Sequence, residues 1–236
     1  QVMHKPKKII SIVNVIESSI ARESDFILPI KAGPEIGVAS TKAFTAQVTV
    51  LTMMSLELGK MRGEFSRSQY RALLNELNVI PKKIEKVLES KALIEDIAAQ
   101  YKDSSNSLYL GRGVNFPIAL EGALKLKEIS YIHAEGYPAG EMKHGPLALI
   151  EDGMPVVVIA PRDQHYKKTI SNMQEVIARG AKVLLVTNKS KDEVYSENIW
   201  QTIEVENTED DLFPFLVSIP LQKLAYYSAL KKGYDI

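Results

Sequence analysis

Short apolar runs alternate with longer amphipathic segments through the second half of the chain. The runs are rich in Val, Ile and Leu, and they predict buried strands at Ser107–Leu110, Met154–Ala160, Lys182–Thr187 and Trp200–Val205. Around them, apolar residues recur every three or four positions, which predicts helices at about Phe116–Ala134, Asp163–Arg179 and Asp211–Lys232. Strands that alternate with helices form a parallel sheet covered on both faces. The pattern therefore predicts a three-layer α/β fold.

The same pattern recurs nearer the N-terminus at an offset of 174 or 175 residues. The matching pairs are Lys8–Asn14 with Lys182–Asn188, Ala46–Leu51 with Leu221–Tyr226, and Gly59 with Gly233. Each glycine of the last pair is predicted to end a helix, because glycine is common just beyond a helix C-terminus. Coincidences in one register indicate two copies of one structural unit.

The repeat also predicts how the chain is organised. Gln1 aligns with Glu175, so the first copy begins midway and lacks the counterpart of residues 107–174. The predicted parts are the second half of one unit at 1–65, a helical linker at 66–103 and a complete unit at 104–236. Pro81 divides the linker into two helices or kinks a single one. Because the first copy is truncated, we expect that the native chain continues upstream.

The composition excludes several classes of protein. Lys and Arg total 29 among 236 residues, as do Asp and Glu, so no overall charge attracts nucleic acid or a membrane surface. The chain has no Cys, which excludes disulfides, thiolate metal sites and a Cys nucleophile. Its apolar runs are too short to span a bilayer, and its N-terminus does not resemble a signal peptide. We therefore expect a cytoplasmic enzyme.

One predicted helix carries acidic and basic groups and runs directly into a loop rich in Gly and Pro. Lys125 lies three residues before Glu128 and four after Glu121, so the three side chains share one face. Such pairs are most often solvated surface pairs. Here the flanking residues are largely apolar and leave little of the helix exposed, which favours a desolvated pair used in chemistry. Lys125 and Glu128 are therefore candidate catalytic residues.

The four His residues have no metal-ligand spacing, and no metal site is predicted. His4 and His165 lie among polar residues and are interpreted as surface groups. His133 falls near the predicted helix end, where its charge would suit the helix dipole. His144 ends the loop 135–144, which is too polar to pack as core and too rich in Gly and Pro for a helix. We expect this loop to project and to be fixed by another subunit.

Three loops are candidate anion sites. One is Gly111–Gly113, which follows a strand but lacks the spacing of a nucleotide fingerprint. Another is Ala160–Asp163, which also follows a strand but has no Ser or Thr donors. Both are interpreted as structural turns. Ser40 or Thr41 is predicted to cap the helix that begins there. Free N–H groups at a helix start also suit anionic oxygens, so capping and binding are compatible.

Two of these segments carry a family resemblance. Ala119–Pro146 resembles the isomerase half of the glutamine–fructose-6-phosphate aminotransferases, also called glucosamine-6-phosphate synthases. Pro34–Thr45 resembles a second signature of that family, and the likeness extends at lower density to Ile236. The resemblance implies the sugar isomerase (SIS) fold, in which two similar α/β domains bind phosphosugars. No cofactor is expected.

The resemblance also implies a reaction and roles for particular residues. The family converts fructose 6-phosphate and ammonia from glutamine into glucosamine 6-phosphate, a precursor of amino sugars and cell walls. Glu128 would move a proton between C1 and C2, with Lys125 stabilising the charge that develops. His144 would assist ring opening and would enter from the other subunit of a homodimer. The sugar contacts would come from Val38, Ala39 and Ser40.

Parts of the family's machinery are missing from the sequence. These are the glutaminase domain with its Cys nucleophile, the Ser/Thr-rich phosphate loops of the first copy and a Schiff-base lysine in a tail beyond Ile236. We therefore expect this fragment alone to be inactive. One alternative is another phosphosugar isomerase or sugar-phosphate deaminase of the same fold. A second is a non-catalytic phosphosugar-binding regulator, which predicts no acid/base pair on the pocket helix.

Overall fold

The computed structural model describes residues 8–189 and 198–236. The chain divides into two compact units, Gln1–Ala72 and Leu73–Ile236. The boundaries at 65 and 103 that the repeat suggested stay a prediction. His4, interpreted above as a surface residue, lies outside the described residues.

The second unit is built on a five-stranded parallel sheet with the strand order β4-β3-β5-β6-β7. Its strands are β3 (Asn106–Gly111), β4 (His133–Pro138), β5 (Pro155–Ile159), β6 (Lys182–Asn188) and β7 (Gln201–Val205). The parallel sheet confirms the fold class predicted from the sequence. Strand β4 was not predicted, and it forms one edge of the sheet by pairing with β3 along its whole length.

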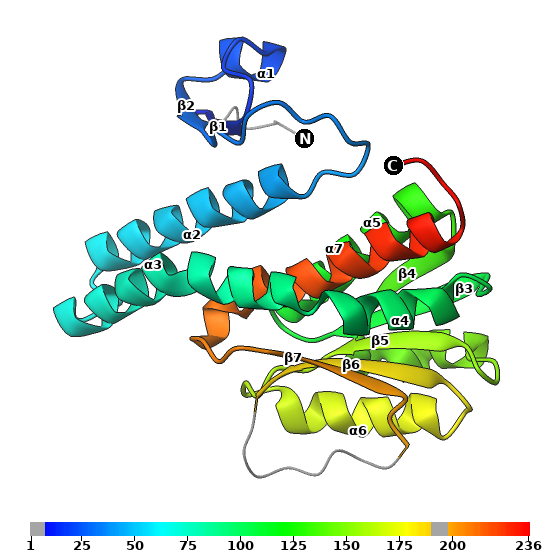
Figure 1. Cartoon of the computed structure of the whole chain (residues 1–236). Coiled ribbons are helices and arrows are strands. Elements are labelled where there is room, and N and C mark those ends of the chain that lie inside the picture. The colour runs from blue at the N-terminus through cyan, green and yellow to red at the C-terminus, as the bar shows by residue number, and fades with distance from the viewer. Residues whose placement is uncertain (1–7, 190–197) are drawn as a thin grey trace, which may run out of the picture. The chain divides into compact units, whose positions relative to one another are not determined.

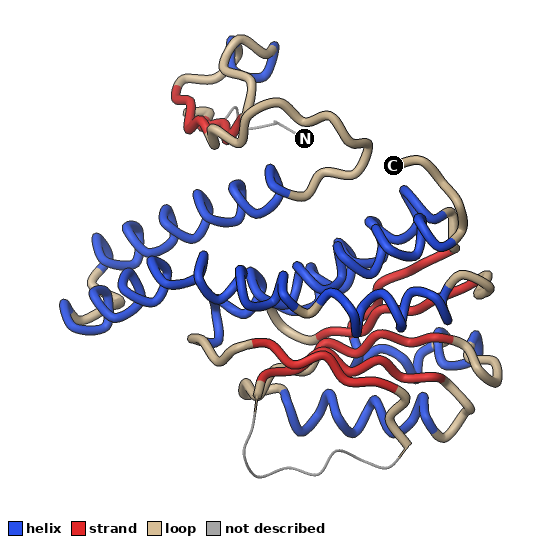
Figure 2. The backbone as a smooth tube through the Cα atoms, viewed as in Figure 1, coloured by secondary structure: helices blue, strands red, loops and turns tan. Residues whose placement is uncertain are grey.

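Helices cover both faces of this sheet, as Figures 1 and 2 show. The helices are α3 (Arg67–Glu89, which begins in the first unit), α4 (Lys91–Tyr101), α5 (Asn115–Ser130), α6 (Tyr166–Ile177) and α7 (Phe213–Lys231). Short 3₁₀ turns follow β4 and precede α7: η1 (Ala139–His144), η2 (Pro146–Leu149) and η3 (Asp210–Leu212). Helix α6 covers one face, whereas α4, α5 and α7 cover the other. The arrangement is the three-layer one expected.

Alternate residues of β3 pack into the two layers. Leu108 and Leu110 belong to the apolar core on the α6 side of the sheet. Tyr109 points the other way, towards α5, where it meets Gly122. A Cβ at Gly122 would lie 2.7 Å from Leu221 of α7 and 2.9 Å from the Tyr109 ring. The glycine therefore lets α5 approach the sheet and α7 closely, which fixes the helix that carries Lys125.

The first unit contains β1 (Ile10–Val13), α1 (Ser19–Arg22), β2 (Phe26–Pro29) and α2 (Lys42–Arg62). Strands β1 and β2 are parallel and pair Ile10 with Phe26. In the second unit, β6 and β7 pair Leu184 with Gln201, which are 174 and 175 residues further along the chain. The paired registers agree with the repeat found in the sequence.

Several predicted helix ends were wrong. Helix α5 ends at Ser130, because Tyr131 adopts a left-handed conformation with φ of 58°. His133 consequently begins β4 and does not lie at a helix C-terminus. Helix α2 ends not at Gly59 but at Arg62, with Gly63 at φ of 74° as its C-cap. In the second unit, Gly233 was predicted to end the last helix, and it does follow the end of α7, with φ of 80°.

The linker region forms two helices. Pro81 lies inside α3, and the break between α3 and α4 comes at Ser90. The two-helix alternative was therefore right, although the proline is not where the helices separate. Within the described parts of the chain, no helix is both long enough and apolar enough to cross a membrane.

Candidate active site

Lys125 on α5 is held between two carboxylates. Its Nζ lies 2.7 Å from Glu128 Oε2 and 3.7 Å from Glu121 Oε1. The Lys125 side chain is only 4% exposed, whereas that of Glu128 is 32% exposed. The pair is therefore desolvated on the lysine side, as the sequence predicted, and Glu128 is the member that a ligand can reach.

Glu121 has a perturbed carboxyl group. Burial raises the pKa of Glu121 above its ordinary value, and the negative charge of Glu128 raises it further, while Lys125 opposes both effects. The cluster therefore joins a lysine to two carboxylates in different environments, an arrangement that suits proton transfer. The sequence placed Glu121 on this face but gave no sign of its raised pKa, which depends on packing by other elements.

The helix is less covered than its apolar flanks suggested. Ala119, Ala123 and Leu126 are buried, but Leu120 is 45% and Leu124 is 38% exposed. The expectation that little of α5 is exposed was therefore wrong for these two leucines.

His144 is presented by η1. The segment was expected to project as a loop too polar to pack, but Ala139 and Met142 are fully buried in the core next to α6. The two apolar side chains anchor the turn, and this part of the expectation was wrong. The outward-facing residues do project: the side chains of His144 and Glu141 are 74% and 64% exposed, and they lie 4.0 Å apart.

Polar contacts join η1 and the neighbouring turn after β3 to α6. Lys143 Nζ lies 3.0 Å from Glu175 Oε1 of α6. The Arg112 guanidinium donates two hydrogen bonds of 3.2 and 3.3 Å to Asn172 Oδ1 of the same helix. A Cβ at Gly140 would lie 2.5 Å from Arg112 Nη2, so a larger residue there would displace the end of the Arg112 side chain. His144 is therefore exposed on a firmly seated turn.

The candidate sugar-binding segment lies in the first unit, before α2. Val38 is 82% exposed, and Ser40 Oγ donates a hydrogen bond of 2.9 Å to Glu35 Oε1. Thr41 is the N-cap residue of α2, but its side chain makes no capping hydrogen bond. The predicted side-chain cap is therefore absent, and the Ser40 hydroxyl instead ties the segment to Glu35.

A cleft of about 740 Å³ lies in the first unit, where β1 and β2 end. It is lined by Asn14, Val15, Ile16, Glu17, Lys31, Gly33, Pro34 and Glu35. Ligands of parallel α/β sheets bind outside the carboxyl ends of the strands, so the cleft is where this architecture puts a binding site. Val38, Ala39 and Ser40, the sugar contacts expected from the sequence, are not among these lining residues, and their role stays a prediction. Sequence reasoning missed the cleft, although Asn14 at a strand end was a usable signal.

The turns after β3 and β5 have polar contacts of their own. Asn115 Nδ2 donates to Asp163 Oδ2 at 3.3 Å, and Asp163 Oδ1 accepts the backbone N–H of His165 at 2.8 Å. These contacts link the two turns across the point where the strand order reverses. Their interpretation as structural turns stays a prediction.

The fold and these clusters define a class of protein. The model of the SIS domain family matches residues 1–56 and 100–232, and the chain belongs to this family. It is 50% identical over 229 residues to a glutamine–fructose-6-phosphate aminotransferase (isomerizing) of Mesorhizobium japonicum. It is likewise 50% identical over 230 residues to the enzyme of that name from Rhizobium meliloti. Each match covers 97% of this chain and 38% of the relative, so the chain spans under half the length of these relatives.

Solved structures point the same way. The C-terminal domain of a glucosamine-fructose-6-phosphate aminotransferase from Francisella tularensis superposes with a TM-score of 0.92 and 45% identity. That match covers 96% of this chain and 63% of the other. A glucosamine-6-phosphate deaminase from Thermotoga maritima matches with a TM-score of 0.66 and 26% identity over 95% of this chain and 62% of its own.

Proposed function

We propose that this chain is the isomerase part of a glutamine–fructose-6-phosphate aminotransferase, which forms glucosamine 6-phosphate in the cytoplasm. The observation that carries the proposal is the buried Lys125 ammonium clamped 2.7 Å from the accessible Glu128 carboxylate. A chain that only bound phosphosugars would not need an acid/base pair on this helix, so the pair counts against that alternative. The aminotransferase relatives at 50% identity support the choice of reaction.

The proposed chemistry uses each group for one task. Fructose 6-phosphate opens its ring and takes up ammonia at C2, with loss of water. Glu128 then removes a proton from C1 and delivers one to C2, while the O1 proton passes to the imine nitrogen, so that the C2 ketimine becomes a 2-amino aldose. Lys125 stabilises the negative charge that develops on the sugar during this transfer, because a fixed cation in a desolvated site costs little reorganisation. Val38, Ala39 and Ser40 bind the sugar.

Assembly is part of the proposal. His144 assists ring opening in the site of the other subunit of a homodimer, since an imidazole exchanges protons near neutral pH. Its side chain is 74% exposed on a turn that α6 holds in place, which suits a group presented to a partner. The ammonia would come from a glutaminase domain in the same full-length chain, as the names of the relatives suggest.

The test is isotope exchange in the full-length protein. Wild-type protein should exchange the C1 proton of the sugar phosphate with D₂O and should form glucosamine 6-phosphate from fructose 6-phosphate and glutamine. Glu128→Gln should slow the exchange by about 10²–10⁴-fold while sugar binding stays within a few-fold, because a positioned acid/base group is lost. Wild-type exchange by Glu128→Gln would refute the role of Glu128.

A sugar-phosphate deaminase of the same fold is the second candidate. The structural match to the Thermotoga maritima glucosamine-6-phosphate deaminase supports it. The same assay separates the two. A deaminase would release ammonia from glucosamine 6-phosphate and would not consume glutamine, whereas the proposed enzyme forms the amino sugar only with an amino donor.

A further inference from the structure

The repeat puts an asparagine at the carboxyl end of a strand in both units. Asn14 follows β1, and Asn188 is the last residue of β6, at an offset of 174. Asn188 is buried and Asn14 is partly buried. In both units the strand that leads to the asparagine pairs in parallel with the next strand of the chain. What one asparagine does can therefore be compared directly with what the other does.

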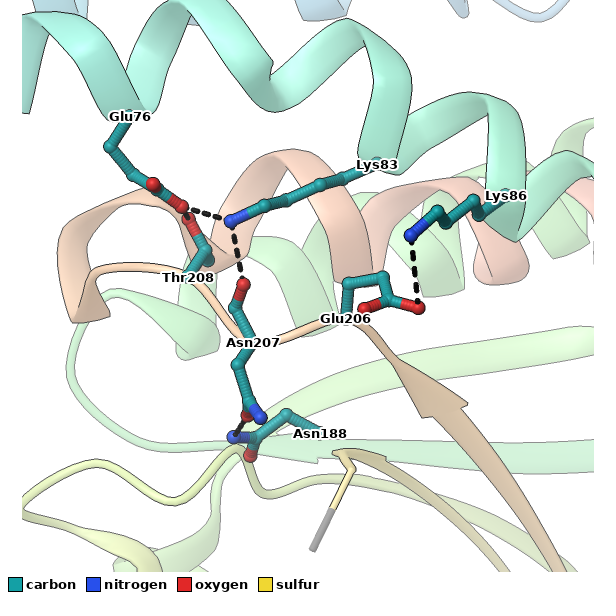
Figure 3. A network of polar contacts seen from close by, with 7 residues as sticks. All are labelled: Glu76, Lys83, Lys86, Asn188, Glu206, Asn207 and Thr208. Carbon is teal, nitrogen blue, oxygen red and sulfur yellow. Dashed lines mark hydrogen bonds and ion pairs between the residues drawn. The ribbon is translucent and has the colours of Figure 1, made fainter.

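Asn188 joins neighbouring loops of the second unit. Its Oδ1 accepts the backbone N–H of Arg162, which follows β5, at 2.7 Å. Its Nδ2 donates to the Asn207 side chain, which follows β7, as Figure 3 shows. The backbone carbonyl of Asn207 in turn accepts a hydrogen bond of 2.7 Å from Lys83 Nζ. Asn188 therefore belongs to a network that ties the sheet edge to α3.

Asn14 instead directs both of its hydrogen bonds to one segment. Its Nδ2 donates to Gly33 O at 2.7 Å, and its Oδ1 accepts the N–H of Ala32 at 3.0 Å. The strand pairing stops just before, where Ile30 N donates to Val13 O at 3.0 Å. Lys31 then takes a left-handed conformation with φ of 53°. The Asn14 carboxamide replaces the missing backbone pairing and fixes the point where the chain turns.

The turn that Asn14 holds leads directly to the candidate sugar-binding residues. Pro34 O, next to Gly33, accepts a hydrogen bond of 2.6 Å from Lys42 Nζ at the start of α2. Glu35 then accepts the Ser40 hydroxyl at 2.9 Å. The intervening segment is otherwise exposed, so its position depends on these few polar contacts. Asn14 also lines the 740 Å³ cleft, together with Gly33, Pro34 and Glu35.

We propose that Asn14 is a positioning residue for sugar binding: its carboxamide fixes Ala32 and Gly33 and thereby sets the place of Val38–Ser40. The proposal rests on the proposed function, in which Val38–Ser40 contacts the sugar phosphate. Asn188 is its counterpart in the other unit and has a structural task only. The segment after β7, 206–212, which contains the Asn207 bonded to Asn188, leads through η3 to α7 and carries none of the proposed sugar contacts.

The experiment uses the full-length protein and three variants: Asn14→Ala, Asn14→Asp and the matched control Asn188→Ala. Initial rates with fructose 6-phosphate give KM and kcat. Asn14→Ala should raise KM about tenfold, the effect of two lost hydrogen bonds of ordinary strength, and should leave kcat within about threefold. The reason is that contacts to the non-reacting part of a sugar affect the substrate and the transition state equally.

The other two variants separate positioning from general stability. Asn14→Asp still accepts the Ala32 N–H but cannot donate to Gly33 O, so its KM should lie between those of wild type and Asn14→Ala. Asn188→Ala should lower the unfolding temperature and leave KM unchanged. Hydrogen–deuterium exchange should speed up across residues 33–41 in the Asn14 variants and not in Asn188→Ala.

The outcomes are distinguishable. A wild-type protein that does not bind fructose 6-phosphate would overturn the proposed function and this proposal with it. A wild-type KM in Asn14→Ala, or an equal rise in Asn188→Ala, would overturn this proposal alone. If Asn14→Ala does not fold, Asn14→Asp decides: unchanged KM and unchanged exchange at 33–41 would refute the positioning role.

Discussion

Replacing Lys125 by Met tests the charge cluster on α5. Methionine keeps the unbranched shape and most of the volume of lysine but removes the ammonium group. The Glu128 and Glu121 carboxylates, 2.7 and 3.7 Å from Nζ, would then share a partly buried site without a cation. Their side chains are 32% and 14% exposed, so Glu128 can be solvated and Glu121 much less so.

The expected cost follows from this difference in exposure. Removing one partner of a fully buried ion pair destabilises a protein by about 3–5 kcal/mol. Here Glu128 regains part of its hydration and Glu121 can take up a proton, so we expect about 2 kcal/mol at pH 7. That is a large fraction of the stability of an ordinary domain, and it should appear first as local opening of α5.

The cost should depend on pH in a defined direction. The pKa of Glu121 is already raised, by burial first and then by Glu128, while Lys125 opposes the rise. Without Lys125 it should rise further. A carboxyl whose pKa is higher in the folded protein stabilises the fold below its unfolded pKa, and this contribution is lost as the pH rises through the folded pKa. Lys125→Met should therefore be less destabilising at pH 5 than at pH 7.

Hydrogen–deuterium exchange of peptides covering residues 115–130 measures this in the full-length protein. Lys127→Met is the matched control, because Lys127 lies on the same helix but is exposed, and it should cost less than about 0.5 kcal/mol. Equal protection of α5 in the two variants, or a Lys125→Met effect that is the same at pH 5 and pH 7, would show that the cluster is not electrostatically coupled as described.

Two further predictions concern His144 and the turn that carries it. Mixing inactive His144→Ala with inactive Glu128→Gln should restore some activity in heterodimers, because one site would receive both intact groups; no recovery after verified subunit exchange would mean that both residues act within one chain. Gly140→Ala should displace Arg112 from Asn172 and reduce activity about tenfold, since a Cβ there lies 2.5 Å from Nη2. Arg112→Ala should remove this clash, so the double variant should be less impaired than the sum of the single ones; strict additivity would count against the contact.

The strands with a clear apolar pattern were predictable, and β4 was not. Residues 154–160 and 182–187 are runs of β-branched and aliphatic residues, and β5 and β6 lie there. Strand β4 reads His-Ala-Glu-Gly-Tyr-Pro and has no such pattern. It forms because β3 offers a free edge that pairs with it from Asn106 to Gly111. That pairing joins distant parts of the chain, so local propensity could not reveal it.

Helix ends depended on contacts that the sequence does not show. Gly59 was predicted to end α2, but a Cβ there would lie 2.4 Å from the Phe65 ring, so the glycine is needed for packing. Gly63 ends the helix instead. At the candidate site, the Lys125–Glu128 contact followed from helical spacing alone, since residues three apart are neighbours. The hydrogen bonds of Asn14 join residues 18 and 19 positions apart and required the strand pairing of β1 with β2.

The candidate groups differ in how firmly the fold holds them. Lys125 and Glu128 lie on a helix that packs closely against the sheet and α7, whereas His144 and Val38–Ser40 lie on connecting segments. Proton transfer between adjacent carbons needs geometry accurate to a fraction of an ångström, and helices supply this better than loops. In the proposed function the connecting segments admit a substrate or meet a partner and must stay accessible, so their exposed residues are positioned by a few polar contacts, such as those of Asn14 and Lys143. Substitutions in α5 should therefore alter the chemical step, and substitutions at these contacts should alter binding and assembly.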